Sequence, residues 1–348
     1  MAPNNQTATV KNALLEHVEH AKIEHPELAP VFQEKTYEPI DRHEVDDRAA
    51  HADPTLKNLL ANATVTHLAP KIGTELSGIQ LHELTNQQRD ELALLVAERG
   101  VVFLRDQDIT IEQQLELGRH YGPLHVHQTN GHPNGLPQVH VIYNTTETSQ
   151  KFLDSHLRDP YSTWHSDVSY EKQPPSYTSL KIITNPPVGG DTLWASGYEA
   201  YERLTPPFKA FVESLTAIHS SKEQAENAAK RGLTVRRPII QTAHPVVRTH
   251  PVTKRKALYV SPLFTRRIVE LSVAESDAVL RFLYKHIAEG HEFQVRFQWT
   301  RNSIALWDNR VTIHLATFDY LPSNRHGVRV TPHGEVPFYE PDAETKSA

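Results

Sequence analysis

The stretch Phe293-Gln-Val-Arg-Phe-Gln-Trp299 decides the fold class of this chain. Apolar and polar side chains alternate along it, which is the pattern of a β-strand that buries one face and leaves the other in water. Further short apolar runs predict strands over 65–69, 72–81, 101–104, 139–143, 177–183, 192–195, 304–307, 311–316 and 328–331. Strands at this close spacing are typical of an antiparallel barrel or sandwich, so we expect a mainly β fold with helical decoration.

Three capping boxes predict the main helices. In each box a Ser or Thr stands three residues before a Gln or Glu, so that side chains and backbone can satisfy one another's hydrogen bonds. The boxes begin at Thr85, Thr110 and Ser272, and glycines suited to the last turn follow at Gly100, Gly122 and Gly290. A further helix is expected to begin at Pro206.

Changes in composition predict how the chain is organised. Residues 1–60 are polar and punctuated by proline, so we expect a partly helical extension outside the core. Its amphipathic stretch 10–23 has no basic face, which favours a packing contact or a homo-oligomer contact over a membrane surface. The main domain is expected over 61–340, with a helical insertion at about 197–290 and a tail at 341–348.

Composition also excludes several classes of function. The 36 Lys and Arg against 42 Asp and Glu give a formal charge of −6, so nucleic acid is not an expected partner. The chain has no cysteine, which excludes disulfides, thiolate nucleophiles and zinc sites built on cysteine. No apolar run reaches the ~18 residues that a membrane span needs, so no membrane partner is expected. The first residues lack the pattern of a secretory signal, which favours a cytoplasmic location.

The stretch Trp164-His-Ser-Asp-Val168 carries the first candidate metal ligands. It follows residues 131–162, whose Gly, Pro, Asn and Ser content predicts a long loop beside a site. On a strand, residues two apart project to the same face, so His165 and Asp167 can reach one cation. His314 supplies a third ligand, and two histidines with one carboxylate are the set that holds non-haem Fe(II) in oxygenases. The alternative is a pair of core histidines with a hydrogen-bonded aspartate.

Two arginines near the C-terminus predict anionic ligands. Arg325 and Arg329 have the same parity, so on a strand both guanidinium groups aim at the side that His314 is expected to face. A guanidinium in an apolar barrel is costly unless an anion accompanies it. The planar fork of arginine fits a carboxylate through two hydrogen bonds, and a sulfonate or sulfate nearly as well. The pair therefore predicts sites for two anions.

Several separated motifs occur in an order known from one family. They are His165-Ser-Asp-Val-Ser-Tyr170, Gln173-Pro-Pro175, Gly189-Gly-Asp-Thr-Leu-Trp194, Trp307-Asp-Asn-Arg310, His314, and Arg325 with Arg329. The sequence resembles the taurine and 2,4-dichlorophenoxyacetate dioxygenase family over roughly residues 65–338, and most of all its fungal sulfonate dioxygenase branch. The resemblance implies a double-stranded β-helix (jelly-roll) core, an Fe(II) centre, and 2-oxoglutarate and O2 as co-substrates.

The resemblance also implies roles for individual residues. His165, Asp167 and His314 would bind the iron and so carry catalysis. Thr192 would hydrogen-bond a carboxylate of 2-oxoglutarate, and Arg325 would hold its distal carboxylate.

Substrate contacts are implied for a further set of residues. These are His127, Val168, Trp307 and Arg329, of which Arg329 would bind the anionic group of the substrate. Asn130 and Tyr161 stand where the taurine pattern has Tyr and Asn, so the amine end of taurine lacks its usual partners. The expected substrate is a small organic anion. Hydroxylation would split an alkyl sulfonate into an aldehyde and sulfite, whereas an alkyl sulfate would release sulfate.

Three other functions stay open at the level of sequence. One is a tailoring hydroxylase or desaturase that acts on a natural-product carboxylate or amino acid, and another is a barrel that binds a small anion without catalysis. A zinc hydrolase is disfavoured because it has no need for Arg325. A second His-x-Asp pair, His51 and Asp53, lies in the polar extension and is expected to be a chance match.

Overall fold

The computed structural model describes residues 23–32, 36–37, 42–145 and 161–343. Nearly all of the amphipathic stretch at 10–23, most of the expected tail and the centre of the expected loop at 131–162 lie outside these ranges. The remaining predictions about helices and strands can be compared with the structure directly.

Seven strands form the largest sheet. Their spatial order is β1 (Thr64–His67), β2 (Thr74–Ser77), β3 (Val101–Leu104), β13 (Ile304–Asp308), β5 (Tyr177–Thr184), β15 (Arg325–Val330) and β4 (Val139–Asn144). Neighbouring strands are antiparallel except β2 and β3, which run parallel. The prediction of a mainly β chain is confirmed.

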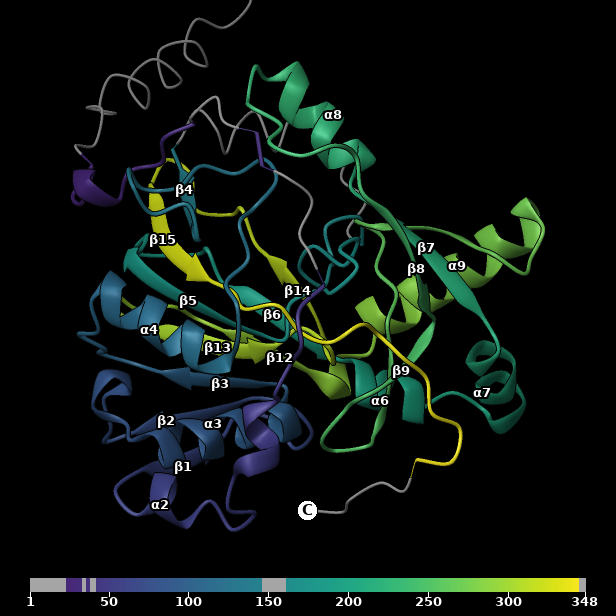
Figure 1. The fold of residues 1–348 in the computed structure, drawn as a ribbon, viewed down its shortest axis with the longest axis horizontal. Helices are drawn as coiled ribbons and strands as arrows, with labels where there is room; N and C mark the ends of the chain where they lie inside the picture. The colour runs from purple at the N-terminus through teal and green to yellow at the C-terminus, as the bar shows by residue number, and fades with distance from the viewer. Residues whose placement is uncertain (1–22, 33–35, 38–41, 146–160, 344–348) are drawn as a thin grey trace, which may run out of the picture.

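A three-stranded sheet packs against one face of the large one. It consists of β12 (Gln294–Phe297), β6 (Thr192–Ser196) and β14 (Thr312–Ala316). In β12, Val295 and Phe297 are buried and Arg296 is exposed, which confirms the alternation expected there. The ring of Phe297 stacks on Phe103 of the large sheet with centroids 4.1 Å apart. The apolar core between the sheets therefore joins strands that are far apart in the sequence (Figure 1).

The predicted capping boxes begin three helices, α3 (Asn86–Arg99), α4 (Ile111–Tyr121) and α9 (Val273–Ala288), and each box is complete. Gly100 follows α3 with a φ of 73°, a conformation in which a Cβ atom would be strained. Helix α3 packs on the second face of the large sheet. Because alternate strand residues face opposite ways, Val102 and Leu104 contact this helical layer while Val101 and Phe103 face the small sheet.

The second half of the N-terminal segment belongs to this helical layer. The 3₁₀ turn η2 (Arg48–His51) and the short helix α2 (Lys57–Leu60) both contact α3. Leu59 is fully buried there and Leu56 nearly so. The prediction that residues 1–60 lie outside the core is therefore wrong for this part, because a few apolar anchors are enough to dock a segment whose overall composition is polar.

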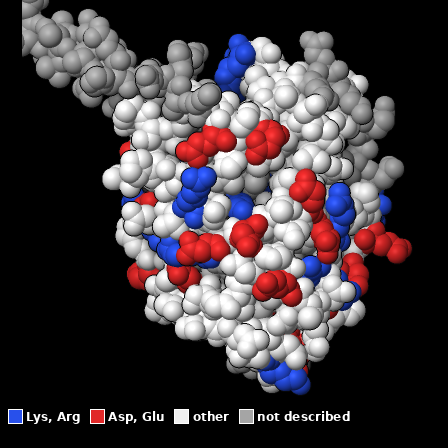
Figure 2. Space-filling view, turned by 90° about the vertical axis from the view of Figure 1, so that its left-hand side faces the viewer, with Lys and Arg blue, Asp and Glu red and all other residues white. Residues whose placement is uncertain are grey.

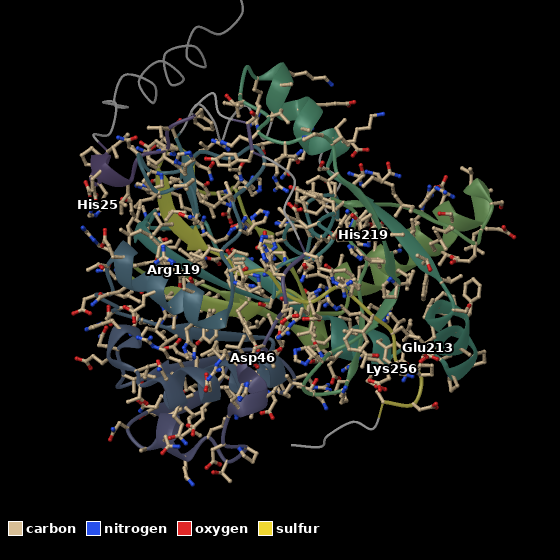
Figure 3. The ribbon with its side chains drawn as sticks, viewed as in Figure 1. His25, Asp46, Arg119, Glu213, His219 and Lys256 are labelled. Carbon is tan, nitrogen blue, oxygen red and sulfur yellow. The ribbon has the colours of Figure 1, made fainter. Side chains whose placement is uncertain are left out.

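The insertion expected to be helical contains both helices and strands. Its helices are α6 (Gly197–Glu202), α7 (Pro206–Glu213), α8 (Lys222–Lys230) and α9, and α7 begins at the predicted proline. Its strands are β7 (Thr216–Ser220), β8 (Gln241–Pro245), β9 (Val247–Thr249), β10 (Lys256–Leu258) and β11 (Thr265–Ile268). These strands are too short for an alternation of apolar and polar residues to be recognised in the sequence. The side chains of Lys256 and Glu213 pair at 2.9 Å between β10 and α7 (Figure 3). Short 3₁₀ turns elsewhere are η1 (Pro26–Leu28), η3 (Leu81–Glu83) and η4 (His291–Phe293).

A buried ionic cluster ties the N-terminal and C-terminal segments to the turn between β13 and β14. Arg310 is fully buried and donates to both carboxylate oxygens of Asp308, at 2.8 and 2.7 Å. The same guanidinium contacts Asp47 of the N-terminal segment and, at 3.2 Å, Glu335 of the C-terminal segment. Since this turn joins β13, which carries Trp307, to β14, which carries His314, the cluster holds in place the strands that bear the candidate site.

Substitution of Arg310 tests the importance of this cluster. Arg310→Met is expected to lower the free energy of unfolding by about 3–5 kcal/mol, because it leaves buried carboxylates without their counter-charge. Urea denaturation followed by circular dichroism measures the change. As a control, Lys57→Met removes a surface pair with Asp53 and should leave the free energy of unfolding nearly unchanged. Equal effects of the two variants would contradict the role given to the cluster.

The surface carries both signs of charge. Figure 2 shows acidic and basic side chains interspersed over one face of the molecule. Within the ranges that the structure describes, no helix combines the length and the apolar character required to cross a bilayer.

Candidate active site

The three candidate metal ligands lie together beside β14. A pair of backbone hydrogen bonds joins His165 to His314, with N–H to O=C distances of 2.9 and 2.7 Å. The Nε2 atoms of His165 and His314 lie 3.6 and 3.8 Å from Oδ1 of Asp167. One ligand atom from each of the three residues lies within 4.8 Å of the other two. The structure therefore brings the predicted set within reach of one ion.

The reason for this proximity differs from the predicted one. Asp167 lies in a turn rather than on a strand, and the next residue, Val168, has a φ of 39°. The turn is held by Asn309, whose side-chain oxygen accepts the backbone N–H of Asp167 at 3.3 Å, and whose carbonyl accepts the hydroxyl of Ser166 at 2.5 Å. The expected alternation along a strand at 165–167 is wrong. Asn309 was not singled out as a site residue, although the motif Trp307-Asp-Asn-Arg310 contains it.

The protonation states of the two histidines and the aspartate suit a divalent cation. Nδ1–H of His165 donates to the carbonyl of Thr163 at 2.8 Å, which leaves the lone pair of Nε2 free to bind a metal ion. Burial, assisted by His165, lowers the pKa of His314 to about 3, so its imidazole is neutral. Burial alone would raise the pKa of Asp167, but the charge of Arg329 holds it well below its usual value.

A ferrous ion fits this set on chemical grounds. Two neutral imidazoles and one carboxylate are the facial triad of non-haem iron sites. The second carboxylate oxygen of Asp167 is buried and has no hydrogen-bond partner among the described residues. Such an orphaned acceptor is expected where a cation belongs.

Arg325 lies in a second polar region that links β15 to β6. It is 2% exposed, and its Nε and Nη2 find no acceptor in the described part of the chain. Its guanidinium lies 5.7 Å from the ring centroid of Trp299, whose indole N–H donates to Oγ1 of Thr192 at 3.0 Å. A Cβ atom on Gly190 would lie 3.3 Å from Cδ of Arg325, so glycine keeps this space open. Buried donors without acceptors are what a carboxylate of 2-oxoglutarate would satisfy.

Tyr320 belongs to the same region but was not predicted. Its hydroxyl is buried and lacks a partner among the residues described. A Cβ on Gly190 would lie 3.2 Å from its ring and 3.3 Å from Arg325, so Tyr320 and Arg325 flank the same glycine. Only the folded loop after β14 brings the tyrosine here, and no local sequence signal marks it.

Arg329 lies beside the metal ligands. Its Nη1 donates to Oδ1 of Asp167 at 2.6 Å, while its Nε is buried without an acceptor among the described residues. The two arginines keep the same parity in the structure, because β15 runs in unbroken register with β4 and the extra residue of the β-bulge lies on β5. Both guanidinium groups are buried, Arg329 beside Asp167 and Arg325 beside Trp299.

The other predicted residues surround these groups at different distances. His127 is buried, and its Nδ1 accepts the backbone N–H groups of Thr129 and Asn130. The ring of Trp307 lies 5.1 Å from that of His314 and packs against this candidate ligand. Two further predicted residues, Val168 and Tyr161, contribute apolar surface.

Val168 packs in an apolar cluster with Tyr170 and Phe264, and the ring of Phe264 lies 6.1 Å from that of His165. Tyr161 is half-buried and packs against the apolar cluster of the insertion, which includes Trp164. Phe264 comes from the insertion and was not predicted, because its position beside His165 depends on how the insertion docks.

Comparison with known proteins places this arrangement in a family. Residues 64–331 match the family model described as taurine catabolism dioxygenase TauD, TfdA family. An alpha-ketoglutarate-dependent sulfonate dioxygenase of Saccharomyces cerevisiae is 43% identical over 329 residues, covering 91% of this chain and 79% of the relative. An alpha-ketoglutarate-dependent dioxygenase of Penicillium expansum is 40% identical, covering 90% and 87% of the two chains.

A solved structure shares the fold as well as the sequence. The crystal structure of a taurine dioxygenase from Burkholderia xenovorans has a TM-score of 0.69 and 35% identity, covering 82% of this chain and 95% of that one. The resemblance noted from the motifs is thereby confirmed. The chain belongs to the TauD and TfdA family of dioxygenases, whose co-substrate alpha-ketoglutarate is 2-oxoglutarate.

Proposed function

We propose that this protein uses Fe(II), 2-oxoglutarate and O2 to hydroxylate a small organic anion, with an alkyl sulfonate as the first choice and an alkyl sulfate as the second. The observation that carries the choice of an anion is Arg329, a buried guanidinium that contacts Asp167 and has a spare N–H beside the ligand set. The sulfonate dioxygenase of S. cerevisiae supports the choice of sulfonate.

His165, Asp167 and His314 are assigned as the iron ligands and thus as the catalytic centre. When bound, the ferrous ion supplies the redox chemistry that couples decarboxylation of 2-oxoglutarate to hydroxylation of the substrate. The protein supplies orientation: Thr163 fixes the tautomer of His165, and Asn309 holds the turn that presents Asp167.

The remaining site residues are assigned to the two organic molecules. Arg325 and Thr192, with Tyr320 as an added donor, hold 2-oxoglutarate. The substrate-binding set is Arg329, His127, Asn130, Val168, Tyr161 and Trp307. The facing sheets are assigned as a jelly-roll core within a dioxygenase domain at 61–340, and a cytoplasmic location is kept as part of the proposal.

A coupled assay tests the function. With Fe(II), 2-oxoglutarate and O2, butanesulfonate should yield succinate and sulfite in equal amounts, because hydroxylation at the carbon that bears sulfur collapses to an aldehyde and sulfite. Hexyl sulfate should yield sulfate if sulfate esters are accepted. Succinate formed only with carboxylates or amino acids would support a tailoring hydroxylase or desaturase instead. Absence of the visible charge-transfer band on anaerobic addition of Fe(II) and 2-oxoglutarate would indicate a non-catalytic barrel.

A further inference from the structure

His140 lies beside the proposed anion site but has no role in the assignments above. It is on β4, directly opposite Arg329 of β15 in the antiparallel register. Directly opposed residues project to the same face of a sheet with Cβ atoms about 5 Å apart. The ring of His140 also lies 4.6 Å from the ring of His127. Three nitrogen-bearing side chains from separate parts of the chain therefore converge at one place.

The hydrogen bonds of this group determine where its protons lie. Nδ1 of His127 accepts two backbone N–H groups, at 3.2 and 3.1 Å, so a neutral His127 carries its proton on Nε2. Nε2 of His140 contacts the side-chain amide nitrogen of Asn130, which donates, so a neutral His140 carries its proton on Nδ1. Burial and the charge of Arg329 hold the pKa of both histidines well below the usual value, so both are neutral near pH 7.

Two N–H donors then lack an acceptor among the described residues, Nδ1 of His140 and Nε of Arg329. Nε2 of His127 contacts the amide nitrogen of Asn130 at 3.5 Å, and a nitrogen that donates cannot accept the proton of His127. Nδ1 of His140 and Nε of Arg329 are both buried. Buried donors without acceptors are costly, and a ligand that accepts from all of them removes this cost.

From this juxtaposition we infer that His140 is a specificity-determining residue that, together with His127 and Arg329, binds the three oxygens of a sulfonate or sulfate group. The inference rests on the proposed function, since it names the group that the substrate must present. A tetrahedral group offers one oxygen to each donor. A carboxylate has two oxygens, which Arg329 and His127 can satisfy, so it should depend less on His140.

The position of the proton on His140 is a direct test that needs no activity. Long-range ¹H–¹⁵N correlation spectra of the protein with ¹⁵N-labelled histidine distinguish the two neutral tautomers. We expect Nδ1–H for His140 and Nε2–H for His127. If the amide of Asn130 were turned over, its oxygen would accept from both rings and His140 would carry its proton on Nε2. That result would overturn the inference.

Substitutions test the contact with the anion. Asparagine places an N–H close to the position of Nδ1, glutamine close to that of Nε2, and phenylalanine provides neither. Binding of butanesulfonate and of pentanoate is measured by calorimetry on the anaerobic protein loaded with Fe(II) and 2-oxoglutarate. His140→Gln and His140→Phe should weaken butanesulfonate about ten- to a hundredfold, whereas His140→Asn should stay within a few fold of the wild type. Pentanoate should change by less than about threefold in all of them.

The controls separate this inference from the proposed function. His286→Phe, on α9, replaces a half-buried histidine that bonds the carbonyl of Ala200 and should leave both affinities unchanged. The role of His140 is overturned if His140→Asn and His140→Phe weaken butanesulfonate binding equally. It is also overturned if the variants lose as much affinity for pentanoate as for butanesulfonate. If butanesulfonate binds in a His140-dependent way but releases no sulfite, the proposed reaction is wrong and the binding role stands.

Discussion

Replacement of His314 by alanine is expected to abolish turnover and the anaerobic charge-transfer band together. The imidazole is one of three proposed protein ligands whose donor atoms lie within 4.8 Å of one another. Loss of a residue that hydrogen-bonds a metal ligand lowers metal affinity or activity about 10–100-fold. Loss of a ligand itself should therefore lower kcat/KM by more than about a thousandfold. Titration with Fe(II) in the presence of 2-oxoglutarate measures the band, and succinate formation measures turnover.

The chain offers a matched control for this experiment. His51 forms the other His-x-Asp pair, with Asp53, and its ring bonds the exposed Asp46 at 2.6 Å. His51→Ala should retain both the band and the activity. A His314→Ala protein that is folded by circular dichroism and still shows the band would refute the iron site.

Replacement of Arg325 by alanine is expected to remove affinity for 2-oxoglutarate. Two hydrogen bonds from a guanidinium to a carboxylate should be worth about a hundredfold or more in Kd. Arg325→Lys keeps the charge without the planar fork and should recover only part of the affinity. The dependence of the charge-transfer band on 2-oxoglutarate concentration measures this Kd directly.

Thermal unfolding provides a second readout for Arg325. Without ligand, its buried donors lack acceptors among the residues described, so Arg325→Ala should be at least as stable as the wild type. Addition of Fe(II) and 2-oxoglutarate should raise the Tm of the wild type but not that of Arg325→Ala, because a ligand stabilises the state that binds it. Arg296→Ala, a half-exposed neighbour paired with Asp191 at 2.7 Å, serves as the control and should keep the wild-type shift. An equal shift in Arg325→Ala would place 2-oxoglutarate elsewhere.

The parts of this protein that could be predicted from sequence are local or carried by motifs. The capping boxes at Thr85, Thr110 and Ser272 predicted three helices because a cap needs only residues within one turn. The alternation in β12 is likewise a property of adjacent residues. That His165, Asp167 and His314 belong to one cluster could be predicted because their residue types and surrounding motifs are distinctive.

Only the tertiary structure decided how those residues meet. Asp167 reaches the two histidines through a turn held by Asn309, not through a strand, and Asn309 is distant in sequence. The N-terminal segment docks through Leu59 in spite of its polar composition. His140 gains its place beside Arg329 only because β4 pairs with β15. Local propensity and residue chemistry are encoded in neighbouring positions, whereas these contacts depend on strand pairing and burial across the whole chain, which no short stretch of sequence contains.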